Sequence, residues 1–394
     1  MEPTDRTPGG SGEPSPAIEE VDPAYAEGWL GDVLPGVLTT LGVPGLSDRL
    51  SLAARLAGVE RVVVLLLDGL GWHQLALGGP QAPTLAALAI GQAPITCGFP
   101  STTPTSLVSL GTAALPGEHG VLAFTSLVPG TDRVLNHSLW ADDPEPAVWQ
   151  PVTPLLDRAR AGGLATAVVN NPLFEATGLT RRSTGVGGYV PATGADEVVA
   201  GVATALLGGA RCVYAYLPDV DRAAHEHGEG SPQWTAAMSD VDKAVARLID
   251  GLPAGAALLI TADHGHLISP WDRRIDLDAV PGLRAGLRAV AGEPRVRYLH
   301  TQPGARDDVL AAWRELAGHA AWIGTREEAA ATGWYGPVTP AHAARLGDVV
   351  AVCREDWSVQ ATAHESPRVA QLVGLHGART RVEMEIPLLV HAAL

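Results

Sequence analysis

The sequence predicts a doubly wound α/β fold, in which a mostly parallel sheet carries helices on both faces. Short apolar runs of strand length recur along the chain with helix-like stretches between them, and this alternation is typical of a parallel sheet. Polar residues that can bind metals follow several of these runs directly, where open α/β sheets place their ligands. With 394 residues, of which 46% are hydrophobic, the chain is long enough for one large domain with an insertion or for two ordinary domains.

The first strand is predicted at residues 61–71, which read RVVVLLLDGLG. Consecutive aliphatic residues there indicate an interior strand with both faces buried, and the run ends at Asp68. Asp68 is therefore expected at the carboxyl end of the strand, beside a ligand site. Taken alone, the same aspartate could equally cap the helix that follows.

Further apolar runs are expected to be strands: Ala165–Val169, Cys212–Leu217, Ala256–Ile260 and Val349–Val352. Two of them lead into acidic residues and histidines: Asp219, Asp221, His225 and His227 follow the second run, and Asp263, His264 and His266 follow the third. Near the C-terminus, His376 lies in a glycine-flanked turn before a last short apolar run. Each of these polar groups thus stands beside a strand end or a tight turn.

Small hydroxylated residues at 99–107, FPSTTPTSL, lead into an apolar helix. Proline is favoured at the first helical position and threonine just before it, so Thr103 is expected at the N-terminus of this helix. The free backbone N–H groups of a helix N-terminus bind anions.

Composition divides the chain into four parts. Residues 1–24, rich in Pro, Gly, Ser and Glu, are expected to be a disordered tail. Residues 25–270 and 347–394 are expected to form the α/β core that holds the site. Residues 271–346 are expected to form a small inserted α/β cap subdomain, because arginines and prolines occur there with a possible strand at Val296–His300 and a helix at Ala305–Gly318.

Charge and composition exclude several classes of protein. The formal net charge is −16, and no run of Lys or Arg occurs, so a nucleic-acid polymer is not expected as a partner. The three cysteines form neither a disulfide framework nor a CxxC metal motif. Because the N-terminus lacks the features of a secretory signal and no apolar stretch is long enough to span a membrane, we expect a cytoplasmic location.

The aspartates and histidines at these strand ends suit zinc or a similar divalent ion. Six such ligands are enough for two sites with three protein ligands each and open positions for substrate. Each piece alone has a plainer explanation, since Asp263-His264-Gly265 is a common turn and Asp221 with His225 could be an exposed helical pair. Their order, with the hydroxylated segment between the first two, makes the set much more specific.

In this order the motifs resemble those of the alkaline phosphatase superfamily, and within it the type I phosphodiesterase/nucleotide pyrophosphatase family. The matching motifs are Asp68-Gly69, Phe99-Pro100-Ser101-Thr102-Thr103, Pro116-Gly117-Glu118-His119-Gly120, Asp221 with His225, Asp263-His264 and His376-Gly377. The resemblance covers most of residues 60–270 and then 370–390, and it implies an alkaline-phosphatase-like fold.

The resemblance also implies a hydrolase that cleaves phosphodiester or pyrophosphate bonds with two divalent ions, most simply zinc, although manganese and iron accept the same ligands. One ion would be held by Asp221, His225 and His376, and the other by Asp68, Asp263 and His264, with the Thr103 oxygen as a fourth ligand. Thr103 would be the nucleophile and would form a covalent phosphothreonine, because a threonine hydroxyl needs a base or a metal to attack near neutral pH. Thr102 is the alternative nucleophile.

The sequence departs from the family pattern at Phe124, where many members carry an asparagine that binds a phosphoryl oxygen. The first asparagine after that turn is Asn136. The phosphoryl charge would then be stabilised by the helix N-terminus at Thr103, or by Asn170 or Asn171. His119, His227 and His266 are expected to be structural residues or to support the ligands.

Other activities stay open. A sulfatase is excluded because Cys97 lacks the Cys-x-Pro-x-Arg context, whereas a phosphomonoesterase or a phosphonate hydrolase of the same superfamily is the runner-up. A non-catalytic metal-binding protein is the second alternative. The expected substrate is a small-molecule phosphate ester whose identity the sequence does not give, and the oligomeric state is likewise not given.

Overall fold

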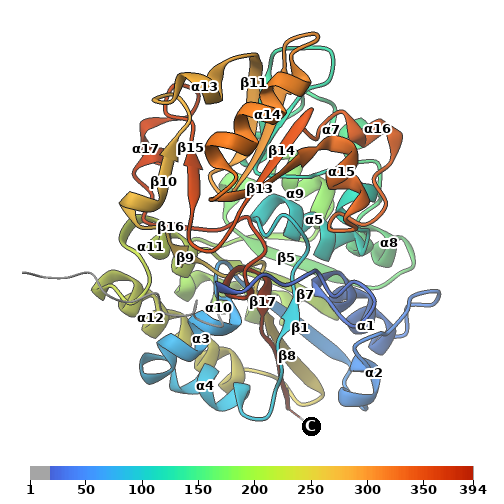
Figure 1. The fold of residues 1–394 in the computed structure, drawn as a ribbon. Helices are drawn as coiled ribbons and strands as arrows, with labels where there is room; N and C mark the ends of the chain where they lie inside the picture. Colours follow the sequence, from blue (N-terminus) through green and yellow to red (C-terminus); the bar gives the residue numbers. More distant parts are fainter. Residues whose placement is uncertain (1–17, 394) are drawn as a thin grey trace, which may run out of the picture.

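A computed structural model describes residues 18–393 of the chain, which contain two six-stranded sheets (Figure 1). The first sheet has the order β18 (Leu388–Ala393), β8 (Ala256–Thr261), β1 (Arg61–Leu67), β7 (Cys212–Leu217), β5 (Thr166–Asn170) and β6 (Tyr189–Pro191). The second has the order β13 (Ala321–Thr325), β14 (Val349–Cys353), β12 (Val296–Thr301), β11 (Leu287–Glu293), β3 (Thr125–Leu127) and β4 (Val134–Asn136).

The first sheet is the predicted mostly parallel one. Strands β8, β1, β7, β5 and β6 run parallel, and only the edge strand β18 pairs antiparallel with β8. In Figure 1 this sheet lies between α1, α2 and α8 on one side and α3, α4, α10 and α12 on the other. The doubly wound α/β prediction is confirmed.

Helices alternate with the strands along the chain, as the apolar pattern predicts. The helices before residue 251 are α1 (Val33–Thr40), α2 (Leu52–Arg55), α3 (Trp72–Gly78), α4 (Pro83–Ala89), α5 (Thr103–Thr112), α6 (Pro116–His119), α7 (Pro146–Trp149), α8 (Leu155–Ala161), α9 (Gly178–Ser183), α10 (Ala195–Leu207), α11 (Asp219–His227) and α12 (Pro232–Asp250). The later ones are α13 (Pro281–Arg284), α14 (Arg306–Ala317), α15 (Arg326–Ala331), α16 (Pro340–Ala343), α17 (Pro367–Ala370) and α18 (Arg381–Met384).

Strand β1 forms the centre of the main core. Its six aliphatic side chains from Val62 to Leu67 are completely buried between the helices of both faces. Burial of a Val or Leu side chain stabilises a fold by about 1.5–3 kcal/mol, so this strand alone anchors the sheet strongly. Because β1, β7 and β8 are parallel neighbours, the residues that follow them lie at one edge.

The second sheet is antiparallel and is assembled from more of the chain than the predicted insertion of residues 271–346. Strand β14 pairs with β12 and β13, although residues 347–394 were assigned to the core, and β3 and β4 join from the other end. The short run of β14 is as apolar as a core strand, so its composition does not reveal which sheet it enters. Helices α13 and α14 pack on one face of this sheet.

A buried ion pair joins the second sheet to the C-terminal segment. Arg295, in the turn between β11 and β12, lies 2.7 Å from Glu383 of α18, and both side chains are fully buried. The Glu383 carboxylate also accepts a hydrogen bond from the backbone N–H of Ala378, at 3.0 Å. The loop that carries His376 is therefore held by both parts of the fold.

The predicted disordered tail, residues 1–24, is only partly within the described chain, and residues 1–17 lie outside it. The remainder differs from the prediction. Glu20 forms a β-bridge with Thr380, and the backbone N–H of Val21 donates to the carbonyl of Arg379 at 2.7 Å. Arg379 also forms ion pairs with Glu20 and Asp22. Acidic residues that look like part of a polar tail thus pair with a distant arginine.

Three two-stranded sheets complete the described chain. They are β10 (Arg274–Asp276) with β15 (Ser358–Gln360), β9 (Leu267–Ile268) with β16 (Gly374–Leu375), and β2 (Ile95–Thr96) with β17 (Glu385–Ile386). The pairing of β9 with β16 brings the loop after β8 beside the loop that carries His376.

Across residues 18–393 we find no helix of the length and apolarity that a membrane crossing requires.

Candidate active site

The carboxyl ends of β1, β7 and β8 bring three aspartates together, as the parallel topology requires. Asp68 follows β1 directly, Asp221 lies in the first turn of α11, and Asp263 follows β8. The turn after Asp68 needs glycine, because Gly69 has φ +70° and a Cβ there would lie 2.3 Å from the ring of His266. The Gly69 N–H donates to Asp263 Oδ1 at 3.1 Å, which fixes one carboxylate against the turn.

Asp68, Asp263 and His264 form one group of buried side chains whose ligand atoms face one another. The Nε2 atom of His264 lies 3.5 Å from Asp68 Oδ1 and 3.4 Å from Asp263 Oδ2. Tyr216 of β7 donates a hydrogen bond from its hydroxyl to Asp68 Oδ2 and so orients that carboxylate. The structure therefore brings together the three side chains that the sequence assigned to one ion.

Thr103 lies beside this group. Helix α5 begins at Thr103, with Thr102 in an extended conformation before it and Pro104 in its first turn. The Thr103 hydroxyl lies 3.1 Å from His264 Nε2, whereas Thr102 is fully buried and its hydroxyl has no hydrogen-bond partner within residues 18–393. Of the two threonine hydroxyls, only that of Thr103 lies within hydrogen-bond distance of a predicted ligand among the described residues.

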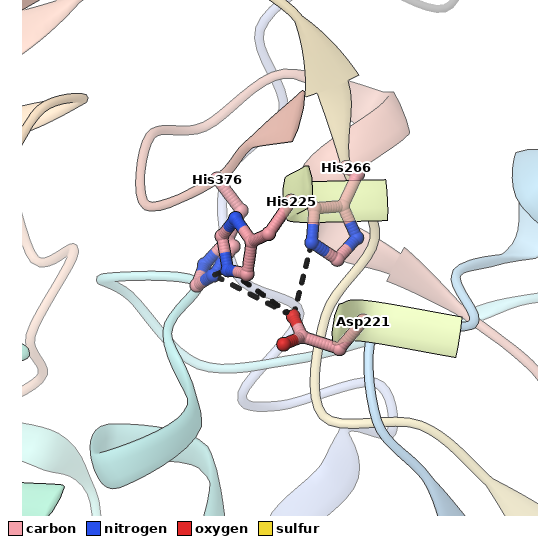
Figure 2. Close-up of side chains that lie close together, drawn as sticks. All are labelled: Asp221, His225, His266 and His376. Atoms are coloured by element: carbon pink, nitrogen blue, oxygen red, sulfur yellow. Dashed lines mark hydrogen bonds and ion pairs between the residues drawn. The ribbon is translucent and has the colours of Figure 1, made fainter. Parts of the chain in front are cut away.

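Asp221, His225, His266 and His376 form a second group (Figure 2). His225 Nε2 lies 3.4 Å and His376 Nε2 3.9 Å from Asp221 Oδ1. His266 Nε2 lies closer, at 3.0 Å from the same oxygen. Three of these residues are the ligands that the sequence assigned to the other ion, and His266 is an addition.

Burial and mutual charge set the protonation of both groups. Burial raises the pKa of Asp68 well above its usual range, and the nearby Asp221 and Asp263 raise it further. Burial lowers the pKa of His225, His264 and His376, which keeps their imidazoles neutral. Neutral imidazoles offer the lone pairs that metal coordination needs.

Two further pKa values depend on the contact between Asp221 and His266. Burial disfavours the charged form of both Asp221 and His266. Nevertheless, His225 and His266 together hold the pKa of Asp221 below its ordinary value. The carboxylate of Asp221 in turn raises the pKa of His266 despite its burial. Each side chain of the pair thus favours the charged form of the other.

The donor set fits two divalent ions on the geometry of the protein alone. Four buried atoms that point into the two groups have no hydrogen-bond partner among the described residues: Asp68 Oδ1, Asp221 Oδ1, Asp263 Oδ2 and His266 Nε2. Buried carboxylate oxygens without partners are costly unless a cation compensates them. The groups adjoin, because the rings of His264 and His376 stack with centroids 3.6 Å apart.

Other candidates from the sequence lie outside these groups. His119 is buried and binds the Ser109 hydroxyl at 3.0 Å through Nε2, which makes it part of the packing between α5 and α6. His227 is partly exposed at the end of α11, and Asp219 pairs with Arg222. None of these three belongs to either group of candidate ligands.

Within residues 18–393, the hydrogen bonds of the asparagine side chains give no sign that one of them binds a phosphoryl oxygen in place of the asparagine missing at Phe124. The side chains of Asn136 and Asn171 accept hydrogen bonds from Ser138 and Leu173 and so cap short helices. Instead, the backbone N–H of Phe124 faces the carboxyl of Glu293 at the end of β11. Burial raises the pKa of Glu293 to about 8. Sequence reasoning missed this residue, because it lies in the second sheet.

A comparison with protein families gives the same assignment as the motifs. The profile described as type I phosphodiesterase/nucleotide pyrophosphatase matches residues 62–379, which is most of the chain. The chain belongs to this family. The predicted membership is thus confirmed, and the chain is a hydrolase of the phosphodiesterase and pyrophosphatase kind within the alkaline phosphatase superfamily. No curated protein matches the chain in sequence.

Solved structures with the same fold include murine ectonucleotide pyrophosphatase/phosphodiesterase 5, at 21% identity and a TM-score of 0.67, with 84% of this chain and 88% of that chain covered. An inactive variant of that protein, in which a threonine is replaced by alanine, is known in complex with AMP and is 20% identical over the same shares, with a TM-score of 0.67. Phosphonoacetate hydrolase from Sinorhizobium meliloti 1021, in complex with phosphonoformate, is 19% identical over 85% of this chain and 90% of that chain, with a TM-score of 0.62. At 19–21% sequence identity, the similarity to these structures shows that the chain shares their fold.

Proposed function

We propose that this family member uses two divalent ions and Thr103 to cleave phosphodiester or pyrophosphate bonds in small-molecule substrates. The observation that carries the proposal is the position of the Thr103 hydroxyl, 3.1 Å from His264 Nε2. Thr103 is only half-buried, so a substrate from solvent can reach its hydroxyl. The inactive threonine-to-alanine variant of the murine relative supports a threonine nucleophile.

The residues that would hold the ions are those assigned from the motifs. Asp68, Asp263 and His264 would hold one together with the Thr103 oxygen, and Asp221, His225 and His376 would hold the other. Zinc, or alternatively manganese or iron, would supply the positive charge that stabilises a threonine alkoxide and the phosphoryl oxygens.

The chain itself supplies the nucleophile and part of the phosphoryl site. Attack by the Thr103 oxygen on phosphorus would form an O–P bond while the O–P bond to the leaving group breaks, so that the phosphoryl group, still carrying its second substituent, is esterified to Thr103 until water hydrolyses this bond. The phosphoryl group would lie at the N-terminus of α5, a ten-residue helix whose first backbone N–H groups have no partner within the helix. The N–H groups of α5 would then stabilise part of the phosphoryl charge, a role that an asparagine has in the many family members without Phe124 at this position.

A nucleotide is the favoured substrate class, since the murine relative binds AMP. A phosphonate is the second candidate, because phosphonoacetate hydrolase shares the fold over 85% of this chain. The cytoplasmic location and the absence of a nucleic-acid partner stay predictions from the sequence.

The proposed function is tested by assaying the purified, zinc-loaded protein against p-nitrophenyl esters: a phosphate monoester, a phosphate diester, a nucleoside monophosphate and a phosphonate. We expect the diesters to be the better substrates and chelation to abolish their turnover. Rapid quench and mass spectrometry should trap on Thr103 the phosphoryl group of the diester together with its remaining substituent. Turnover of the monoester or the phosphonate ester with none of either diester would replace the proposal by its alternative, and metal binding without hydrolysis of any ester would indicate a binding protein.

A further inference from the structure

His266 belongs to the group shown in Figure 2, although the family motifs place only Asp221, His225 and His376 there. It lies in the short segment between β8 and β9, and its ring is completely buried. Its Nε2 atom lies 3.0 Å from Asp221 Oδ1, the shortest of the three distances that join a histidine nitrogen to this oxygen. The role of His266 follows from the direction in which this nitrogen points and from what surrounds it.

The other ring nitrogen of each histidine in the group faces a backbone carbonyl. His225 Nδ1 lies 2.7 Å from Gly374 O, His376 Nδ1 lies 2.8 Å from Ser101 O, and His266 Nδ1 lies 3.3 Å from Gly69 O. An Nδ1–H that donates to a carbonyl leaves the Nε2 lone pair free, which is how protein histidines are commonly oriented toward a metal. All three Nε2 atoms are therefore presented inward.

This orientation sets the Nε2 lone pair of His266 against a carboxylate oxygen of Asp221. Two acceptors 3.0 Å apart repel each other unless a cation lies between them. Neither atom has a hydrogen-bond partner within residues 18–393 that could relieve the contact. A proton on His266 or a shared metal ion can fill this role.

The arrangement of the three rings favours the metal ion. Their centroids lie 4.9 Å apart for His225 and His266, 5.0 Å for His225 and His376, and 5.0 Å for His266 and His376. A ring that only donated to Asp221 would not need to be equidistant from the other two. Two ligand atoms at 2.0–2.1 Å from a tetrahedral zinc lie roughly 3.3 Å apart, and His225 Nε2 and His376 Nε2 are 3.2 Å apart.

We infer that His266 is a fourth protein ligand, which makes this group a three-histidine, one-aspartate site. The inference rests on the two-ion part of the proposed function but not on the hydrolytic activity. Four protein ligands complete a tetrahedral shell, as in structural zinc sites, while three leave a position open. The ion at this site would therefore bind the more tightly, whereas the ion at Asp68, Asp263 and His264 would have only three Asp and His ligands and would depend on the nucleophile Thr103 for its fourth.

Proton NMR of the full chain loaded with cobalt(II) tests the inference, because each imidazole bound through Nε2 gives one strongly shifted, exchangeable Nδ1–H signal. We expect four such signals, from His225, His264, His266 and His376. The His266→Gln variant should lose one of them, and its affinity for the tighter ion should fall by more than about 100-fold, beyond the 10- to 100-fold typical of a residue that only supports a ligand. His227→Gln, two residues beyond His225 and outside the group, is the matched control and should change neither quantity.

Three signals in the wild-type protein would overturn the inference, and this measurement needs no variant to fold. So would His266→Gln with an affinity within about 10-fold of wild type, because glutamine can still donate a hydrogen bond to Asp221 but is a poor ligand. Four signals in a protein that hydrolyses none of the esters would leave the inference standing and remove the proposed function instead.

Discussion

The hydroxyl of Thr103 and the Nε2 atom of His264 lie 3.1 Å apart, although 161 positions separate the two residues in the chain. The contact joins the start of α5 to the carboxyl end of β8. His264 Nε2 is also the atom that faces Asp68 and Asp263. A divalent ion bound there would hold the hydroxyl in place for attack, so the nucleophile is the first residue to test.

Replacing Thr103 with alanine should reduce turnover of the best diester by several orders of magnitude while the bound metal stays near its wild-type content. The reason is that the substitution removes the attacking oxygen and leaves the Asp and His ligands in place. Thr103→Ser should keep partial activity, since it retains the hydroxyl. Steady-state kinetics and elemental analysis on the same preparations measure the two effects.

Thr102→Ala is the control for this prediction, because Thr102 is buried before the helix and its hydroxyl has no hydrogen-bond partner within residues 18–393. Its turnover should stay within about tenfold of wild type. If Thr102→Ala lost activity while Thr103→Ala kept it, the nucleophile would be the neighbouring residue. Full activity in both variants would indicate that water attacks directly.

The parts of the site that the sequence predicts well are those tied to long apolar strands. Asp68 and Asp263 each follow a buried run whose length and composition allow few alternatives, and parallel pairing then fixes where they meet. His266 was harder to place. His264 and His266 lie two residues apart in the short segment between β8 and β9, so their spacing offered a hint that both belong to the site, but the direction of the His266 side chain depends on the turn at Gly69.

Removing the hydroxyl of Tyr216 should weaken metal binding at Asp68. The hydroxyl donates to Asp68 Oδ2 and leaves Oδ1 facing His264, and loss of such a supporting contact typically costs 10- to 100-fold in metal affinity. We therefore expect Tyr216→Phe to bind the weaker ion about 10- to 100-fold less tightly, as measured by competition with a chelator. Tyr189→Phe, whose hydroxyl donates to the carbonyl of Asn171, should bind both ions normally.

Adding one methyl group at Gly111 should destabilise the helix that carries Thr103. A Cβ at this position would lie 1.9 Å from the carbonyl oxygen of Ser183, so α5 and α9 would have to move apart. Overpacking of this kind costs about 1–3 kcal/mol, and a backbone atom on the other side leaves little room to adapt. The midpoint of urea unfolding should fall accordingly for Gly111→Ala.

Gly79→Ala serves as its control, since a Cβ there would meet nothing closer than Ala86 Cβ at 3.8 Å. This variant should match the wild-type midpoint or exceed it slightly. Equal midpoints for both variants would show that α9 yields easily and that the close approach at Gly111 has no energetic weight.

The second sheet shows where sequence patterns stop being informative. Strands β3 and β4 are three residues long, and β3 reads Thr-Ser-Leu, which has no periodicity to distinguish it from a loop. Strand β4 pairs with β3, and the pairing of β3 with β11 depends on contacts between segments more than 150 residues apart, such as the hydrogen bond from the Thr125 hydroxyl to Gly292 O. Such pairing follows from the packing of the whole fold, and for the same reason Glu293 could not be placed beside Phe124 from the sequence.

Glu293 should make the metal-free protein less stable as the pH rises. Burial raises the pKa of Glu293 from its ordinary value of 4.5 to about 8, with smaller opposing effects from the Phe124 N–H and Arg297. Between these two values the native protein keeps a proton that the unfolded chain releases, so stability falls with increasing pH from about 4.5 and the loss is complete above about 8. A difference of this size corresponds to at most about 5 kcal/mol.

Glu293→Gln removes the titration and keeps the shape of the side chain. The free energy of unfolding of this variant relative to wild type should therefore increase between pH 5.5 and pH 8.5, by roughly 2–4 kcal/mol, when both are measured by urea unfolding after removal of metal. Glu315→Gln, at an exposed position of α14, should show no such change with pH. If the two variants followed the same pH dependence, Glu293 would be ionised in the native protein, and its buried carboxylate would need a cation near Thr102 and Phe124 to compensate it.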